Sequence, residues 1–239
     1  MKKIIIFAFF VFMFSDLSFA SNDEIKANKS AEFVHESIEK VLEVVRSSDA
    51  SYRYGETLNL VEELFDYENV PRFALTYKNY KNLSDEQKDY LSKYSKRSVA
   101  LMLLDKFFVK NMEYTISKAA KHNKDFEIYL SIRKVEGIDL KQVLGDVNEN
   151  GNDGNIEVIF IVNEKEGKFI LKDIKAMNLS FLIKARDFYQ KKLKENNMDY
   201  DELVDDLIMS LERDEKDFRQ KYKVSEDLFP SIKTLLILE

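Results

Sequence analysis

Residues 125–133 read DFEIYLSIR, and this stretch decides the fold because apolar and polar side chains alternate along it without a break. Successive side chains of a β-strand point to opposite faces of the sheet, so a period of two predicts a strand with one buried face. The buried face would carry Phe126, Ile128, Leu130 and Ile132. We therefore expect an antiparallel sheet with one covered face at the centre of the protein.

Other strands are expected on both sides of this one. Residues 112–118 would form its hairpin partner, and residues 156–162 are apolar at nearly every position, which is typical of a central strand. A turn over residues 164–167 would then lead into a last strand over residues 168–174. The sequence thus predicts a sheet of about four strands.

Helical patterns flank the strands. Apolar residues recur at three- and four-residue steps over residues 31–45 and 58–65, which predicts two short helices before the sheet. Ser84 and Gln87 form a capping box, so a long helix should begin there. The same period returns over residues 182–193 and 203–211, after the sheet. The order helices, sheet, helices predicts an α+β fold with helices wrapped around one side of the sheet.

The first twenty residues resemble an export signal. Lys2 and Lys3 precede an apolar run over residues 4–14, and Ser18 and Ala20 supply the small side chains that a signal peptidase recognises. The run is short for a membrane span, and the chain has no cysteine to accept a lipid. We expect residues 1–20 to be removed as a signal peptide and the mature protein to be periplasmic.

Composition limits the partners. Without residues 1–20 the chain keeps a net charge of about −7 and has no basic stretch, which argues against nucleic acid as a partner. With no cysteine for a disulfide, stability has to come from burial, to which 18 Phe and 12 Tyr contribute. We expect a monomer with one core domain over residues 21–213 and a C-terminal extension of unknown role over residues 214–239.

Few residues suit catalysis or metal binding. His35 and His122 are the only histidines, so a nucleophile–histidine pair or a zinc site has little to build on. Asp146 to Glu157 has the spacing of a calcium-binding EF-hand loop, but Glu157 would begin a strand where that motif requires a helix. The sequence predicts no catalytic residue, no metal and no cofactor, and it leaves calcium binding by this loop open.

Asp173 and Ser180 allow two interpretations. Asp173 would end the last strand and Ser180 would begin the next helix, so both side chains could bond to backbone amides of the turn between them. In the other interpretation Asp173 is a general base with a raised pKa at the mouth of an apolar cavity.

Two blocks of sequence resemble the MlaC-type, or toluene-tolerance, family of periplasmic phospholipid carriers. The first contains Phe65-Asp66-Tyr67-Glu68, Arg72-Phe73-Ala74-Leu75 and Leu83-Ser84-Asp85-Glu86-Gln87. The second contains Lys172-Asp173-Ile174 and Leu179-Ser180-Phe181. The resemblance covers residues 34–211. It departs from the family at Asn178 and near Thr76, where glycines are usual, and Asn178 would belong to the same structural turn as Asp173 and Ser180.

The resemblance implies an NTF2-like α+β domain whose sheet and helices enclose an apolar cavity for acyl chains. Such a protein carries phospholipid between an outer-membrane lipoprotein complex and an inner-membrane ABC transporter with its substrate-binding-domain subunit, and so maintains outer-membrane lipid asymmetry. Bound phospholipid would be cargo rather than a cofactor. The expected lipid-contacting side chains are Phe73, Leu101, Leu104, Phe108, Phe126, Ile128, Leu130, Ile132, Ile159, Ile161, Phe169 and Leu171.

Two other functions stay open at this point. One is a small NTF2-like enzyme that acts on an apolar substrate with Asp173 as its general base. The other is a periplasmic interaction protein whose core is filled by its own side chains. The sequence shows no charged anchor for a lipid headgroup, so a carrier that holds only the tails and tolerates many lipid classes is expected.

Overall fold

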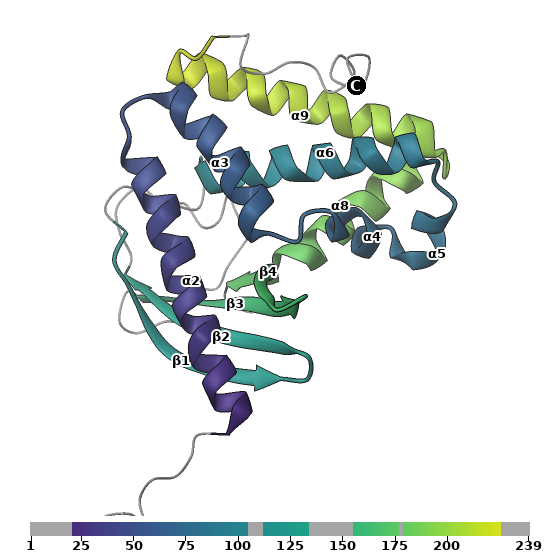
Figure 1. Cartoon of the computed structure of the whole chain (residues 1–239). Helices are drawn as coiled ribbons and strands as arrows, with labels where there is room; N and C mark the ends of the chain where they lie inside the picture. The colour runs from purple at the N-terminus through teal and green to yellow at the C-terminus, as the bar shows by residue number, and fades with distance from the viewer. Residues whose placement is uncertain (1–20, 105–111, 134–154, 177–178, 226–239) are drawn as a thin grey trace, which may run out of the picture.

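The computed structural model of the protein describes residues 21–104, 112–133, 155–176 and 179–225 (Figure 1). Five helices precede the sheet in these residues and two follow it, which confirms the expected α+β order. The first five are α2 (Asn22–Arg46), α3 (Ala50–Leu64), α4 (Asn69–Ala74), α5 (Thr76–Lys81) and α6 (Asp85–Met102). The last two are α8 (Phe181–Glu195) and α9 (Tyr200–Tyr222).

The described residues form one antiparallel sheet in the order β1-β2-β3-β4-β5. Its strands are β1 (Tyr114–His122), β2 (Asp125–Arg133), β3 (Asn155–Lys165), β4 (Lys168–Ala176) and β5 (Leu179–Ser180). The fifth strand was not expected, because a two-residue strand is too short to show a period in sequence. β3 and β4 are joined by Glu166 and Gly167, both with positive φ, as a two-residue hairpin turn of type I′ requires.

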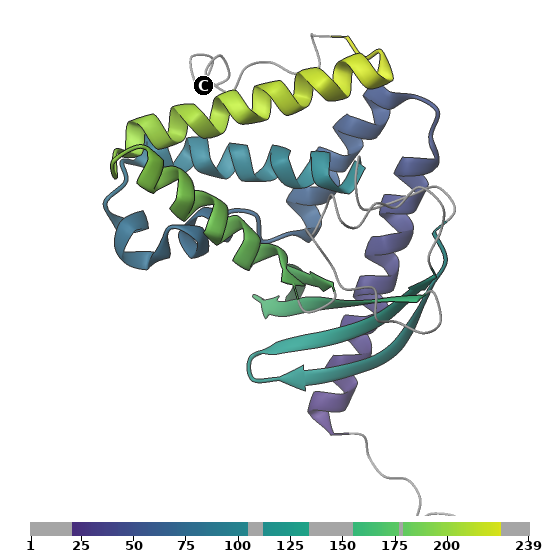
Figure 2. The ribbon, with the colours of Figure 1, turned by 180° about the vertical axis from the view of Figure 1, so that it is seen from behind.

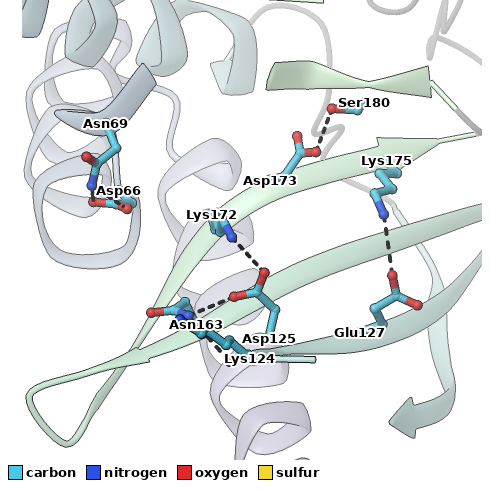
Figure 3. A network of polar contacts seen from close by, with 10 residues as sticks. All are labelled: Asp66, Asn69, Lys124, Asp125, Glu127, Asn163, Lys172, Asp173, Lys175 and Ser180. Atoms are coloured by element: carbon cyan, nitrogen blue, oxygen red, sulfur yellow. Dashed lines mark hydrogen bonds and ion pairs between the residues drawn. The ribbon is translucent and has the colours of Figure 1, made fainter. Parts of the chain in front are cut away.

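The alternation along β2 is confirmed. Phe126, Ile128, Leu130 and Ile132 are all buried, whereas the residues between them are partly exposed. The register pairs Phe126 with Val162 and Ile128 with Phe160, so even-numbered residues of β2 and β3 share the covered face. The other face carries ion pairs across β3: Lys172 of β4 donates to Asp125 at 2.6 Å and Lys175 to Glu127 at 3.4 Å (Figure 3).

Helices cover the apolar face in two ways. α2 lies along β1 and β2 on that face, in front of the sheet in Figure 1 and behind it in Figure 2. α3, α6 and α9 form a separate helical layer, in which α6 packs on both α3 and α9. α4 and α8 pack on each other, and α8 also contacts β4. The helical layer therefore reaches the sheet mainly at its β4 side.

Local sequence signals fix where the helices begin. Ser84 accepts the amide proton of Gln87 while the Gln87 side chain accepts that of Ser84, which is the expected capping box. Asp49 and Asp199 are simple N-caps of α3 and α9, and the side chain of each accepts two backbone amides of the first turn. The first helix was expected to be short, but α2 runs for 25 residues because its buried stripe continues from Ala27 to Val45.

A buried ion pair joins the helical layer. Arg97 of α6 donates to both carboxylate oxygens of Glu215 of α9, at 2.6 Å each, and the Tyr54 hydroxyl of α3 donates to the same carboxylate at 2.8 Å. The ion pair is almost inaccessible to water, with Arg97 7% and Glu215 2% exposed. Burial raises the pKa of Glu215, and the charge of Arg97 counteracts that rise.

The helix that carries Glu215 crosses the domain boundary expected after residue 213. α9 continues through residue 213 without a break to Tyr222, and both Glu215 and Phe218 are buried in it. The boundary expected after residue 213 would cut this helix inside its packed part. The sequence did not reveal this packing. Residues 212–223 are rich in charge, and nothing in the sequence distinguishes the buried Glu215 from its exposed charged neighbours.

We predict that removing one partner of the ion pair is far worse than replacing both. Arg97→Ala or Glu215→Ala should lower the free energy of unfolding by about 3–5 kcal/mol, because each leaves an uncompensated buried charge. The double variant Arg97→Met/Glu215→Leu should lose much less, since no charge stays buried. Urea unfolding followed by circular dichroism measures all three, and equal losses in the single and double variants would contradict the prediction.

Candidate functional site

A buried polar turn connects β4 to α8 (Figure 3). One oxygen of Asp173 accepts the backbone amides of Ile174 and Leu182, at 2.9 and 3.0 Å, and the other accepts the Ser180 hydroxyl at 2.6 Å. Ser180 in turn caps α8 by accepting the amide of Ile183 at 3.0 Å. Asp173 therefore ties the end of β4 to the first turn of α8. Asn178, expected in the same turn, lies outside the described residues.

Asp173 is 8% exposed, and its surroundings decide what chemistry it can do. Burial raises the pKa of Asp173, and the bonds from Ser180, Leu182 and Ile174 offset part of the rise. A raised pKa suits a general base, but a base also needs an oxygen that can reach a substrate proton. Both oxygens of Asp173 already accept hydrogen bonds inside the turn, which favours the structural role.

Next to this turn lies a small cavity between the helices and β4, which we call the inner cavity. Its volume is about 10 Å³, roughly the space of one water molecule. Most of its wall is apolar, and Asp66, Lys172 and Asp173 form the polar part. The apolar lining residues are Phe65, Tyr67, Val70, Val99, Met102, Leu171, Ile174 and Phe181.

Phe65 forms a single parallel β-bridge with Leu171, and the amide of Asp66 donates to the Leu171 carbonyl at 2.8 Å. This bridge fastens the segment before α4 to β4. The bridge itself is made by backbone groups, and the residues that it joins line the inner cavity.

A larger pocket of about 530 Å³, which we call the outer pocket, adjoins the inner cavity. It shares Asp66 and Lys172 with the inner cavity, so the two are neighbours. Apolar, aromatic and cationic side chains all contribute to its lining. Its lining consists of Asp66, Asn69, Arg72, Phe73, Thr76, Tyr77, Lys172, Leu182 and Arg186.

Thr76 in this lining is held in an unfavourable backbone conformation, with φ of 66°. A β-branched residue in the left-handed region is strained by about 1–2 kcal/mol, which a glycine would avoid. MlaC-type proteins usually have a glycine near this position. The turn between α4 and α5 thus survives the substitution, at an energetic cost.

The expected lipid-contacting residues do not line one cavity. Phe126, Ile128, Leu130 and Ile132 lie in the continuous core, and Phe169 joins them by packing edge-on against Phe126 with ring centroids 5.9 Å apart. Leu104 is also buried in this core. Leu171 reaches the inner cavity, and Leu101 lines a separate groove of about 350 Å³ between α6 and α9.

Three of these residues are placed differently from the expectation, and a fourth lies outside the described residues. Ile159 and Ile161 pair with Tyr129 and Glu127, so they lie on the opposite face of the sheet from Phe126. Phe73 is 42% exposed in the outer pocket, because α4 turns Val70 and Ala74 inward instead. Phe108 is the residue outside the described part of the chain.

Sequence reasoning missed the cationic side of the outer pocket. Arg72 lies on α4 and Arg186 on α8, more than a hundred residues apart, and each packs over an aromatic ring of the pocket. The guanidinium carbon of Arg72 is 5.2 Å from the Tyr77 ring centroid, and that of Arg186 is 6.0 Å from that of Phe73. Arg72 belongs to the Arg72-Phe73-Ala74-Leu75 block, but the sequence held no signal that Arg186 would line the same pocket.

Within the described residues no group of three or more His, Asp or Glu side chains is arranged to hold a metal ion. Most of the loop with EF-hand spacing, residues 146–154, lies outside those residues, and Glu157 has an exposed side chain on β3. None of the described helices is long and apolar enough to cross a membrane.

The protein is an α+β protein in which helices cover one face of an open antiparallel sheet. A solved phospholipid-binding protein from Ralstonia solanacearum, determined in complex with a phospholipid, has a similar fold. The two structures align with a TM-score of 0.59 at 12% sequence identity, over 77% of this chain and 97% of that one. The chain belongs to the MlaC protein family, whose model matches residues 35–208. This is a family of periplasmic lipid carriers rather than of enzymes.

No curated protein matches the chain in a sequence search. The family assignment therefore depends on the family model, and the structural match supports the fold.

We predict that Asp173 matters for stability and not for a reaction. Asp173→Asn keeps an oxygen for the two backbone amides and should lower the free energy of unfolding by about 1 kcal/mol. Asp173→Ala leaves both amides and the Ser180 hydroxyl without that acceptor, so it should cost about 2–4 kcal/mol. Ser180→Ala, which removes the helix cap, is the matched control at about 1 kcal/mol.

The Asp173→Asn comparison also has an expected pH dependence. The pKa of Asp173 is raised in the folded state. Between the pKa of the unfolded chain, 3.8, and the higher pKa of the folded chain, Asp173 is therefore protonated in the folded chain and ionised in the unfolded one. The stability of the wild type relative to Asp173→Asn should thus fall as pH rises through that range. A relative stability that grows with pH would mean that the hydrogen bonds outweigh burial.

Proposed function

We propose that this protein is a phospholipid carrier of the periplasm that binds lipid without chemical change and exchanges it between two membrane complexes. The observation that carries the proposal is the pair formed by the outer pocket and the adjoining apolar inner cavity. Both lie between α4, α8 and β4, in a fold whose solved relative was determined with a phospholipid bound.

The energetics of acyl chains explain why the tails need an enclosed site. At about 0.8 kcal/mol per methylene, two chains of roughly sixteen carbons would cost on the order of 25 kcal/mol to expose to water. The outer pocket, at about 530 Å³, is open and partly polar, so it suits one end of the lipid. The tails would enter the inner cavity, which has to widen from about 10 Å³ as α4 and α6 separate from β4.

The start of the folded domain supports export with signal removal. Ser21 would be the first residue of the mature chain, and its hydroxyl accepts the amide of Glu24 at 3.2 Å as the N-cap of α2. Cleavage after Ala20 would therefore leave the first helix with its cap intact.

The family supports the identity of the exchange partners: an outer-membrane lipoprotein complex and an inner-membrane ABC transporter with its substrate-binding-domain subunit. In this proposal the protein serves outer-membrane lipid asymmetry. Specificity for the two partners lies in docking surfaces rather than in a reaction.

The first test is native mass spectrometry of the full-length gene product, expressed in a Gram-negative host and purified from the periplasm without detergent. We expect a mature mass that begins at Ser21 and a ladder of adducts at phospholipid masses. A bare protein mass under gentle conditions would instead support the interaction protein with a filled core. A mass that includes residues 1–20 would contradict the signal peptide.

A second test locates the tails by photo-crosslinking. Phe181 lines the inner cavity, whereas Phe188, two turns further along α8, is 37% exposed and lines neither the inner cavity nor the outer pocket. Replacing Phe181 with benzoylphenylalanine should give a phospholipid crosslink on irradiation of the loaded protein, and the same change at Phe188 should give none. Equal crosslinking at both positions would contradict the inner cavity as the tail site.

A further inference from the structure

The outer pocket gathers more positive than negative charge, in a chain whose net charge is −6. Arg72, Lys172 and Arg186 line it from α4, β4 and α8, and Asp66 is the one carboxylate among its lining residues. The side-chain amide of Asn69 donates to both Asp66 oxygens, at 2.7 Å each, so this carboxylate already has a hydrogen-bond partner beside the pocket.

The two arginines are the cations that can bind a ligand. Lys172 is committed to Asp125 at 2.6 Å on the polar face of the sheet. The ion pair found for Arg186 in the described residues is a loose, exposed contact with its neighbour Asp187 at 3.5 Å, of a kind that contributes little. The contact of Arg72 found in the described part of the chain is with the ring of Tyr77.

Aromatic rings orient both guanidinium groups. Arg72 lies over the ring of Tyr77 and Arg186 over that of Phe73, and these two rings are 63% and 42% exposed at the pocket. A planar guanidinium held over a ring still presents its N–H edge, and that edge fits the oxygens of a phosphate in a bidentate manner. α4 and α8 are themselves joined, since the Gln190 side chain donates to the Ala74 carbonyl at 2.9 Å. The two arginines thus sit on a fixed pair of helices.

Large exposed aromatics beside the arginines fit an amphiphile better than a free anion. Phe73 and Leu182 supply an apolar wall, and the inner cavity with its apolar lining lies directly behind Asp66 and Lys172. A ligand with a phosphate at one end and hydrocarbon at the other matches both halves of this arrangement.

We propose that Arg72 and Arg186 bind the phosphate of the lipid headgroup in the outer pocket, while the hydrocarbon enters the inner cavity. This inference rests on the proposed function and adds headgroup recognition to it. It replaces the sequence-based expectation that the carrier holds tails alone. The protein should therefore prefer phospholipids to diacylglycerol, which has the same tails without the phosphate.

The test compares two classes of lipid, phospholipid and diacylglycerol, and three variants of the full chain. Delipidated protein is mixed with vesicles that contain phosphatidylethanolamine, phosphatidylglycerol and diacylglycerol with identical acyl chains, then separated, and its bound lipid is extracted and quantified. The wild type should load phospholipid at least about tenfold better than diacylglycerol, the ratio that a charge-assisted hydrogen-bond pair supplies. Arg72→Gln/Arg186→Gln should reduce that ratio to near one without reducing diacylglycerol loading.

Two variants serve as controls. Lys184→Gln removes an exposed positive charge of α8 that does not line the pocket, so it should keep the wild-type ratio. Arg72→Lys/Arg186→Lys keeps the charge and should retain part of the preference. Thermal melts of each variant test whether the fold is intact. We expect melting temperatures close to that of the wild type, because both arginines lie at the surface of α4 and α8.

The outcomes separate the two proposals. If the wild type loads neither kind of lipid, the carrier function fails. If it loads both equally, or if the double glutamine variant keeps the phospholipid preference, headgroup recognition fails and the carrier function stands. Competition by millimolar inorganic phosphate would assign the arginines to a free anion and overturn the inference as well, whereas no competition is expected for a lipid headgroup.

Discussion

The helical layer depends on one buried ion pair, Arg97 with Glu215, which the hydroxyl of Tyr54 completes. Each of these side chains comes from a different helix, so the ion pair fixes α3, α6 and α9 relative to one another. Such a pair is costly to bury and tolerates little misalignment, so it specifies geometry more than it adds stability. The position of α6 matters most, because Val99 and Met102 of that helix form part of the inner cavity wall.

The β4 side of the sheet is where the fold leaves room for a ligand. α2 packs directly on β1 and β2, and large apolar side chains fill the space beneath it. At β4 the contacts are lighter and of a different kind: a single β-bridge from Phe65, the Asp173 turn and the start of α8. Backbone hydrogen bonds at the edge of a layer can open and close without disturbing a packed core. In the function we propose, lipid would therefore load at α4 and β4 rather than along β2.

Headgroup recognition and tail binding make different demands on the same small region. The tails need an apolar space that excludes water, which the side chains behind Phe65 provide. A phosphate needs oriented donors near the surface, and Arg72 and Arg186 on their aromatic supports meet that need. The strained backbone at Thr76 lies between Phe73 and Tyr77, so the turn that carries these supports is held in place against a conformational cost.

The sequence alone determined the α+β order, the buried face of β2 and the capped start of α6, because each depends on the period or chemistry of a few neighbouring residues. It did not determine which face of β3 is covered: that strand is apolar on both sides, so only its pairing with β2 turned Val158 and Phe160 inward and Ile159 outward. It also missed the ion pair of Arg97 with Glu215 and the shared position of Arg72 and Arg186 in the lining of the outer pocket. These pairs join residues far apart in the chain, and a charge shows its partner only when the packing of helices brings the two together.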